Sequence, residues 1–392
     1  MFFFRRPQKK KIFVLGLDGA VKPLIDRPQL PYFEKLLAKG FYQDLISRPA
    51  ITSVAWPSMV SGVNAGKHGI FGFRVGEELF FADAKKAPEL WDYLPSIALN
   101  IPMTYPVRPI EGIMISGMMT PDWGEEAVYP SSEIPFLREQ GFVFEPEINL
   151  EAVQQSMAAK IKVIKEYFHR PWELFFVVFR EFDVLQHFFW GQEIPFYQEI
   201  ENLLRWLLEE EKFLNSPENS LLIVSDHGFA PVSQVFDLEQ WIKENGWADK
   251  VFVGGWGSLY LRGGKEEKEK NKKELEKALK AVKVEDKEIL DVYPREEIYW
   301  GPWAEKGPDL VVSPRRQLGF TFGLRTGKII SPSEHKNGCH LEEGIFLALG
   351  ERIRGGKKEE ARIFDVFATI MELAGHKLPP EIDGEPLLQL QS

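Results

Sequence analysis

The chain has 392 residues, which is enough to bury a large core in one or two domains. Its formal net charge of −10 argues against a general nucleic-acid binder, so we expect no nucleic-acid duplex as a partner. The single cysteine, Cys339, excludes an internal disulfide framework and suits a reducing compartment. The longest strongly apolar run, residues 174–179, is too short to span a bilayer, and we therefore expect a cytoplasmic protein without a membrane span.

Apolar runs and amphipathic segments alternate along the chain. The runs that predict buried strands are residues 11–17, 97–101, 112–116, 174–179, 220–225 and 309–312, with a further strand within 338–350. The segments that predict helices are residues 31–40, 88–94, 151–168, 196–213, 266–283 and 363–374. Strands that alternate with helices indicate an α/β fold with a central, mainly parallel sheet.

The pattern is least regular between residues 231 and 325, where the charged helix at 266–283 is best explained by a solvated face. No internal repeat and no low-complexity linker interrupts the sequence. We therefore expect residues 1–228 and 327–392 to form an α/β core. Residues 229–326 would be a smaller lobe that is inserted into this core and shapes the substrate site.

Residues 51–70 place two adjacent hydroxyl groups, Thr52 and Ser53, before a short apolar segment with helical spacing. Gly62 ends this segment, and Pro57 suits the first turn of a helix, where its missing N–H has no intrahelical partner. Free backbone N–H groups and the helix dipole at such a helix start favour an anion. A hydroxyl here is therefore either a helix N-cap or a nucleophile that faces a phosphate.

Acidic residues follow three of the predicted strands. Asp18 follows the first strand, Asp226 follows the strand at 220–225, and Asp183 comes a few residues after the strand at 174–179. Ligands of open parallel sheets bind outside the carboxyl ends of the strands. Three carboxylates gathered there repel one another unless a cation lies between them, although each aspartate taken alone is also a common turn former.

Three histidines accompany these carboxylates. His187 lies four residues after Asp183, so the two side chains share one face of a helix, and His227 directly follows Asp226. His340 lies beside a strand flanked by glycines. Mixed oxygen and nitrogen ligands suit zinc, and manganese less well, and six ligands are enough for two divalent metal ions with an open position on each. Two such ions can hold the attacking and leaving oxygens of a phosphoryl displacement.

The other histidines lack such a setting, and we expect them to be structural, with His335 as the first exception to consider. They are His68, His169, His335 and His376. Cys339 lies next to His340, and we interpret it as a small buried residue rather than a ligand.

These motifs resemble the alkaline phosphatase superfamily, in its type I phosphodiesterase/nucleotide pyrophosphatase branch. The segments that carry the resemblance are GLDGA at 16–20, TSVAWPSMVSG at 52–62, GKHGIFGF at 66–73, NIPMTYP at 100–106, SGMMTP at 116–121, DVLQH at 183–187, SDHGF at 225–229, GCHLEEGIF at 338–346 and EIDGEPL at 381–387. They keep their order and extend nearly from end to end. The resemblance implies a three-layer α/β/α sandwich with an inserted lobe.

The resemblance also implies roles for individual residues. It assigns the candidate ligands to two metal sites, one made of Asp183, His187 and His340 and the other of Asp18, Asp226 and His227. Thr52 matches the nucleophile, with Ser53 as the fallback. The implied reaction is hydrolysis of a phosphodiester or pyrophosphate bond through a covalent phospho-threonine intermediate. We expect Ser53 and Trp56 to contact the substrate, a small phosphate ester such as a nucleotide.

Two positions depart from the family pattern. Val54 stands where many relatives have a proline, and Ala55 stands where nucleotide pyrophosphatases place a phosphate-binding asparagine. The second change weakens the case for a nucleotide and removes one donor to the oxyanion, for which the backbone N–H of Ser53 is the expected substitute. The sulfatase signature Cys/Ser-x-Pro-x-Arg is absent around Thr52.

Two alternatives stay open at this point. The same fold supports a phosphomonoesterase, a phosphonate hydrolase or a phosphomutase. A non-catalytic metal-binding relative is the least favoured alternative, because all six ligand positions and the hydroxyl position are filled.

Overall fold

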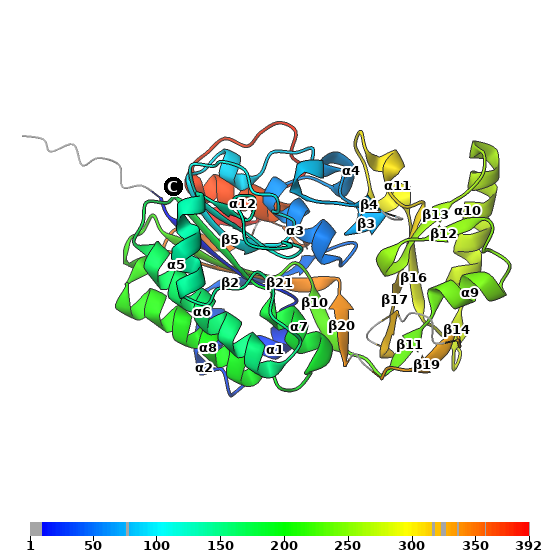
Figure 1. Cartoon of the computed structure of the whole chain (residues 1–392), viewed down its shortest axis with the longest axis horizontal. Coiled ribbons are helices and arrows are strands. Elements are labelled where there is room, and N and C mark those ends of the chain that lie inside the picture. The colour runs from blue at the N-terminus through cyan, green and yellow to red at the C-terminus, as the bar shows by residue number, and fades with distance from the viewer. Residues whose placement is uncertain are drawn as a thin grey trace, which may run out of the picture.

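The computed structural model describes residues 10–75, 78–315, 318–322, 327–334, 337–356 and 358–391. Its centre is a nine-stranded sheet (Figure 1). In spatial order the strands are β23 (Ala361–Arg362), β2 (Phe41–Ile46), β21 (Glu343–Leu349), β9 (Ser220–Val224), β1 (Ile12–Leu17), β8 (Leu174–Phe179), β5 (Ser96–Ile101), β6 (Gly112–Ser116) and β7 (Val128–Tyr129). The five strands from β9 to β6 are parallel, whereas β21 and β7 pair antiparallel with their neighbours, so the predicted mainly parallel sheet is confirmed.

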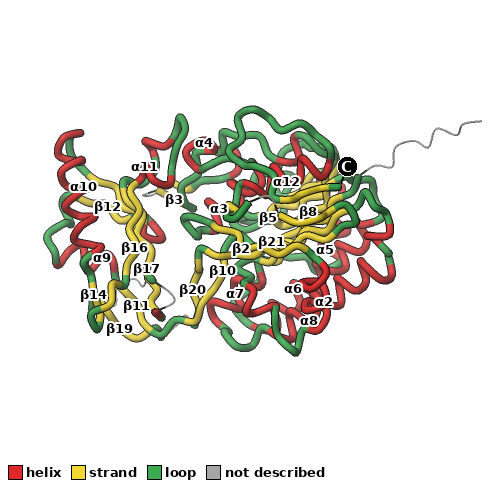
Figure 2. The backbone as a smooth tube through the Cα atoms, turned by 180° about the vertical axis from the view of Figure 1, so that it is seen from behind, coloured by secondary structure: helices red, strands yellow, loops and turns green. Residues whose placement is uncertain are grey.

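Helices cover both faces of this sheet (Figure 2). One face packs against α1 (Lys22–Ile25), α2 (Pro31–Lys39), α5 (Ile134–Glu139), α6 (Leu150–Phe168), α7 (Glu181–Phe188) and α8 (Ile194–Arg205). The other face packs against α3 (Thr52–Ser61) and α12 (Asp365–Ala374). Successive side chains of β1 alternate between the two clusters, with Phe13 and Leu15 on one side and Ile12 and Val14 on the other. The expected three-layer α/β/α sandwich is therefore confirmed.

The start of α3 differs from the prediction. Thr52 is already the first helical residue, so Pro57 lies inside the helix rather than in its first turn. Because proline has no N–H, the carbonyl of Ser53 loses its usual intrahelical donor. Gly62 ends the helix in the left-handed conformation, with φ of 70°, as is common for a glycine after a helix.

Two other predicted helices are shorter than expected. The segment 88–94 contains only a 3₁₀ turn at Leu90–Asp92, because Pro88 and Pro95 bracket it and disfavour helical backbone before them. The helix predicted at 196–213 is α8 up to Arg205, and a short π-helix, Trp206–Glu210, follows it.

A second set of sheets lies beside this core (Figure 1). Its strands are β11 (Gln234–Phe236), β12 (Val251–Val253), β13 (Ser258–Leu261), β16 (Leu290–Pro294), β17 (Leu310–Pro314), β18 (Phe320–Phe322) and β19 (Ile330–Pro332). They pack with α9 (Leu238–Glu244) and α10 (Lys265–Lys280) around a separate hydrophobic cluster that includes Leu259, Leu275 and Leu310. These elements form the lobe, and the boundaries at residues 229 and 326 stay a prediction.

The segment around Asn64 joins the core to the lobe. Asn64 Oδ1 accepts hydrogen bonds from the backbone N–H of Gly66 at 2.9 Å and of Trp300 at 3.1 Å, and Asn64 Nδ2 donates to the carbonyl of Ile298 at 2.7 Å. A Cβ atom at Gly66 would lie 2.2 Å from the Trp300 carbonyl oxygen, so this approach requires glycine. The indole of Trp300 also donates to Asp383 in the C-terminal segment at 2.9 Å. The GKHG and EIDG segments therefore hold the lobe in place.

An ion pair is buried beneath the carboxyl ends of the strands. Lys160 on α6 is 1 % exposed and donates to Glu181 at 2.8 Å, to Asn100 Oδ1 at 2.7 Å and to the carbonyl of Val178 at 2.9 Å. All three Lys160 protons thus have an acceptor, which a buried ammonium requires. Since Glu181 is the first residue of α7, the pair fixes the start of that helix.

The histidines expected to be structural lie in different settings. His68, the last residue of α4 (Ala65–His68), is fully buried, whereas His169 and His376 are exposed, and His335 lies outside the described residues. Cys339 is buried, as expected. Among the described residues, no helix combines the length and the apolarity needed to cross a membrane.

His68 predicts a pH dependence of stability. Burial, aided by Lys85, lowers its pKa from 6.5 to about 3, and its Nδ1 accepts from the N–H of Ile70 at 3.2 Å, which a charged ring cannot do. The unfolded chain therefore binds a proton below about pH 6.5 that the folded chain does not bind, so this stabilising contribution is present above pH 6.5 and is lost as the pH falls. We expect His68→Gln to be less stable than wild type at pH 7 and the gap to narrow by up to about 1.4 kcal/mol per pH unit below pH 6.5.

Urea unfolding at pH 7, 6 and 5 measures this gap. The control is Ser58→Ala, which removes the hydroxyl that lies 2.9 Å from His68 Nε2 but keeps the titrating ring. Its gap to wild type should change far less with pH, and a His68→Gln gap that is constant with pH would contradict the assignment.

Candidate metal centre and nucleophile

The carboxyl ends of three neighbouring strands, β9, β1 and β8, bring the predicted acidic residues together. Asp18 directly follows β1, Asp226 lies two residues after β9, and Asp183 lies in the first turn of α7, which follows β8. All three carboxylates are buried, with at most 4 % of each residue exposed. This proximity follows from the parallel order of the strands, whose ends meet at one edge of the sheet.

Two groups of three side chains form at this edge, and both have the predicted membership. In the first group, His340 Nε2 lies 3.1 Å and His187 Nε2 lies 3.4 Å from Asp183 Oδ1. His340 reaches this place from β20 (Gly338–Leu341), which pairs antiparallel with β10 (Gly228–Pro231). The ligand atoms of this group all lie within 4.8 Å of one another.

The second group consists of Asp18, Asp226 and His227. Nε2 of His227 lies 3.3 Å from Asp226 Oδ2 and 3.6 Å from Asp18 Oδ1. The other Asp226 oxygen, Oδ1, accepts from the backbone N–H of Gly19 at 3.2 Å. The rings of His227 and His340 stack with centroids 3.7 Å apart, so the two groups are in direct contact.

The tautomers of the histidines fit cation binding. In each of the three rings Nδ1 faces a carbonyl oxygen, that of Gly338 at 3.0 Å for His187, of Ala50 at 2.9 Å for His340 and of Gly228 at 3.1 Å for His227. A carbonyl oxygen only accepts, so Nδ1 carries the proton and Nε2 presents a lone pair to the site. Metal-binding histidines commonly have this arrangement, in which the second ring nitrogen donates to a carbonyl or carboxylate.

The carboxylate oxygens complete this test. Within the described chain, Asp18 Oδ1 and Asp226 Oδ2 are buried without a hydrogen-bond partner. The Nε2 atoms of His187 and His340 lie 2.9 Å apart. Buried acceptors that face one another without a donor are costly, and a cation between them removes that cost. The residues present therefore fit two divalent cations.

The charge balance differs between the two groups. Burial raises the pKa of the Asp18 and Asp226 carboxyls well above its ordinary value, and repulsion from neighbouring carboxylates adds to this. Burial acts in the same direction on Asp183, but the positive charge that His187 carries when it is protonated and the Arg180 guanidinium outweigh it and hold the pKa of Asp183 well below its ordinary value. Nη1 of Arg180 donates to Asp183 Oδ2, which leaves Oδ1 for the histidines.

The hydroxyl of Thr52 lies beside the second group. Ile51 occupies the N-cap position of α3 and Thr52 is the first helical residue, so the alternative that Thr52 caps this helix is wrong. Its Oγ1 lies 3.3 Å from His227 Nε2. Ser53 Oγ is fully buried and has no hydrogen-bond partner among the described residues, and it lies one position further into the helix.

Trp56, which we expected to contact the substrate, has another place. Its side chain is fully buried, and Nε1 donates to Asp18 Oδ2 at 3.1 Å. A Cβ atom at Gly16 of β1 would lie 2.7 Å from the Trp56 ring, so strand and indole are in close contact. The indole therefore orients Asp18, and the expected contact between Trp56 and a substrate stays a prediction.

Two residues at the site are missing from the sequence analysis. Trp256 comes from the lobe, in the turn η6 (Gly255–Gly257), and its indole stacks on His340 with centroids 4.9 Å apart and an interplanar angle of 16°. Arg180 joins Asp183 to Glu145, donating from Nε to Glu145 at 3.1 Å. A tryptophan between glycines and an arginine three residues before an aspartate are the weak signals that could have indicated them.

The fold and this arrangement of side chains define a phosphoesterase-type hydrolase of the alkaline phosphatase superfamily. The chain belongs to the type I phosphodiesterase/nucleotide pyrophosphatase family, whose model matches residues 12–341. The resemblance inferred from the motifs is thereby confirmed. A comparison with curated proteins found no match.

Solved structures with the same fold share little sequence with this chain. Phosphonoacetate hydrolase from Sinorhizobium meliloti 1021, in complex with phosphonoformate, has a TM-score of 0.67 at 16 % identity, over 93 % of this chain and 96 % of its own. An inactive form of murine ectonucleotide pyrophosphatase/phosphodiesterase 5, in complex with AMP, has a TM-score of 0.60 at 17 % identity, over 95 % and 96 %. A mutant of alkaline phosphatase PafA has a TM-score of 0.60 at 11 % identity, over 97 % and 99 %.

Substitution of one ligand in each group tests the metal assignment. We expect Asp183→Asn and Asp226→Asn each to lower the zinc content after reconstitution and gel filtration from about two to about one ion per chain, because the amide is a weaker, uncharged ligand of the same size. Elemental analysis measures this content. Asp291→Asn in the lobe, which breaks a 2.9 Å contact to Arg315, is the control and should keep both ions. Unchanged zinc content in either site variant would remove that residue from the ligand set.

Proposed function

We propose that the protein is a two-metal hydrolase that cleaves phosphodiester or pyrophosphate bonds through a covalent intermediate on Thr52. The observation that carries this proposal is the position of the Thr52 hydroxyl, at the start of α3 and 3.3 Å from His227 Nε2. It lies beside six buried side chains whose donor set suits two divalent cations. A threonine hydroxyl is a poor nucleophile alone, and this setting is one that activates it.

Each metal site has its own ligands in this proposal. Asp183, His187 and His340 hold one ion, and Asp18, Asp226 and His227 hold the other. Zinc is the preferred ion and manganese the second choice, given the mixed imidazole and carboxylate ligands. When bound, two such cations polarise the phosphoryl group and lower the pKa of a nearby hydroxyl.

The reaction has two displacements at phosphorus. In the first, a bond forms between Thr52 Oγ1 and phosphorus, the bond to the leaving oxygen breaks, and the leaving group departs with the electron pair and takes up a proton. In the second, a water oxygen bonds to phosphorus, the bond from phosphorus to Oγ1 breaks, and Thr52 regains its proton. The backbone N–H of Ser53 lies in the first turn of α3 and has no intrahelical partner. In this proposal it donates to the phosphoryl oxygens and stabilises their charge.

The substrate in this proposal is a small phosphate ester. Two of the similar structures were solved with AMP and with phosphonoformate, which supports a small anionic substrate of this kind. Hydrolysis of a phosphonate is the second candidate, because the structure of a phosphonoacetate hydrolase is similar to this one, with a TM-score of 0.67. A cytoplasmic location and the lack of a nucleic-acid duplex partner stay predictions, supported by the single cysteine and the net charge of −10.

Hydrolysis of bis-p-nitrophenyl phosphate beside p-nitrophenyl phosphate, with zinc or manganese supplied, tests the function. We expect metal-dependent turnover that favours the diester and is lost in EDTA. Preference for the monoester would make the protein a phosphomonoesterase or phosphomutase instead, and no turnover with zinc bound would support the non-catalytic alternative.

The same assay tests the nucleophile. We expect Thr52→Ala to lower kcat by about 10³-fold or more while zinc content and thermal stability are kept. Ser53→Ala is the matched variant and should keep most of the activity. If the two variants show the opposite result, Ser53 is the nucleophile, and if both stay active, the covalent intermediate is wrong.

A further inference from the structure

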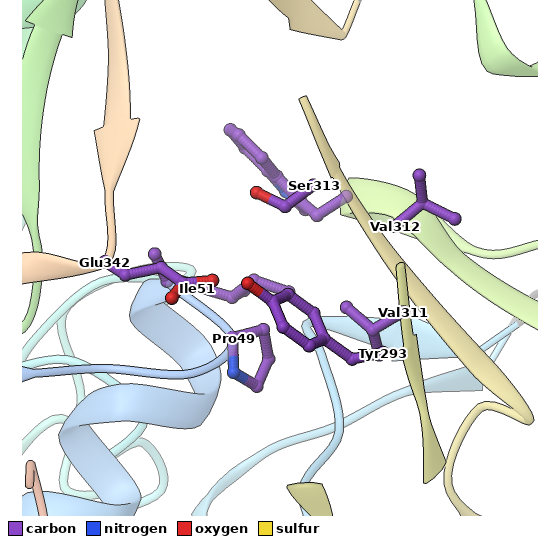
Figure 3. Close-up of a pocket in the computed structure, with 9 residues that line it drawn as sticks. Pro49, Ile51, Tyr293, Val311, Val312, Ser313 and Glu342 are labelled. Atoms are coloured by element: carbon purple, nitrogen blue, oxygen red, sulfur yellow. The ribbon is translucent and has the colours of Figure 1, made fainter. Parts of the chain in front are cut away.

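A narrow cavity lies at the contact between the core and the lobe (Figure 3). Its core side consists of residues 49–51 and Glu342, and its lobe side consists of Trp256, Tyr293 and residues 311–313. The core segment leads directly into the nucleophile, since residue 51 is the N-cap of α3. The carbonyl of residue 50 also accepts from His340 Nδ1 at 2.9 Å. The cavity is therefore next to both the proposed nucleophile and a proposed metal ligand.

Polar and apolar surface contribute about equally to the walls of this cavity. Pro49, Ile51 and two valines supply aliphatic surface, and Trp256 and Tyr293 supply aromatic surface. The cavity has room for little more than a water molecule, so a larger group enters only by displacing a wall. Trp256, which forms one wall, lies between two glycines. Its backbone is in the left-handed conformation, with φ of 58° and ψ of 38°, which L residues seldom adopt.

Glu342 is the one charged side chain among the described residues that line the cavity. Its carboxylate lies beside the Tyr293 hydroxyl (Figure 3). Arg48, which is not part of the wall, neutralises this carboxylate with Nε at 2.8 Å and Nη2 at 2.7 Å from Oε2. The Arg48 guanidinium also lies over the Tyr293 ring, 5.0 Å from its centroid. The cation is thus already used, and the cavity presents a paired carboxylate to a ligand.

We propose that this cavity receives the organic group of the substrate that stays outside the reacting phosphoryl centre, and that the pair of Glu342 and Arg48 restricts it to a group without negative charge. The inference rests on the proposed function and narrows its substrate class to esters with a neutral, apolar or flat group. A second phosphate or a carboxylate in the cavity would lie against Glu342 and find no unpaired cation there. Diesters whose remote organic group is uncharged are therefore favoured over pyrophosphates and over carboxylated phosphonates.

Two ligands with the same three-carbon chain test this selection without turnover. Propylphosphonate and 2-carboxyethylphosphonate differ only by a terminal methyl or carboxylate, and calorimetry with the zinc-loaded full chain gives their dissociation constants. We expect wild type to bind propylphosphonate at least about tenfold more tightly. Tighter binding of 2-carboxyethylphosphonate to wild type would overturn the inference.

Two variants should shift this ratio in opposite directions. Glu342→Gln leaves the Arg48 charge unpaired, so the ratio should move by about tenfold toward 2-carboxyethylphosphonate, and Arg48→Gln leaves the Glu342 charge unpaired, so it should move by about tenfold the other way. Glu342→Asp keeps the charge and should keep the wild-type preference. Equal shifts, or shifts in the same direction, would overturn the inference.

The control variant is Glu218→Gln, which breaks another ion pair of the core, to Arg352 at 3.1 Å, and should leave the ratio unchanged. Kinetics separates the two proposals. Absence of turnover together with an unchanged binding preference would contradict only the hydrolase mechanism. Turnover of diesters together with equal dissociation constants for the two phosphonates would contradict only the proposed charge selection.

Discussion

Crowding of buried carboxylates is the constraint on which the site depends. Asp18, Asp183 and Asp226 come together because three parallel strands end side by side, and burial makes their charge costly. Neighbouring groups offset part of this cost through individual contacts. Arg180 neutralises one carboxylate, Trp56 donates to a second and the backbone of residue 19 to the third. Asp18 Oδ1 and Asp226 Oδ2 are left without a donor among the described residues, which is the arrangement that a bound cation would complete.

The part of this arrangement that sequence could predict follows from local rules. An apolar run that ends in aspartate predicts a strand and its ligand together, and the spacing of Asp183 and His187 puts both on one helical face. The hydroxyl of Thr52 before a helix also predicts its place at a helix start. Parallel order then brings these local features to one edge without any further information.

The part that sequence could not predict depends on contacts between distant residues. Lys160 falls on an amphipathic helix among exposed charges, and its burial follows from acceptors that other elements supply. Trp56 lies four residues after Thr52 in the sequence, but its indole donates to Asp18, whereas Trp256 is two hundred residues away and stacks on His340. Pro57 inside α3 contradicts the usual preference for the first turn because the packing of the helix on the sheet outweighs it.

The order of the chain has a consequence for biosynthesis. A ribosome delivers β1, β8 and β9 first, then the whole lobe, and only afterwards β20 and β21. A growing chain of about 330 residues therefore has five of the six candidate ligands but lacks His340, and strand β21 beside β9 is also missing. The proposed group of Asp183, His187 and His340 therefore cannot assemble until the segment that follows the lobe has been synthesised. If the proposed function is right, a product that ends within the lobe would lack hydrolytic activity.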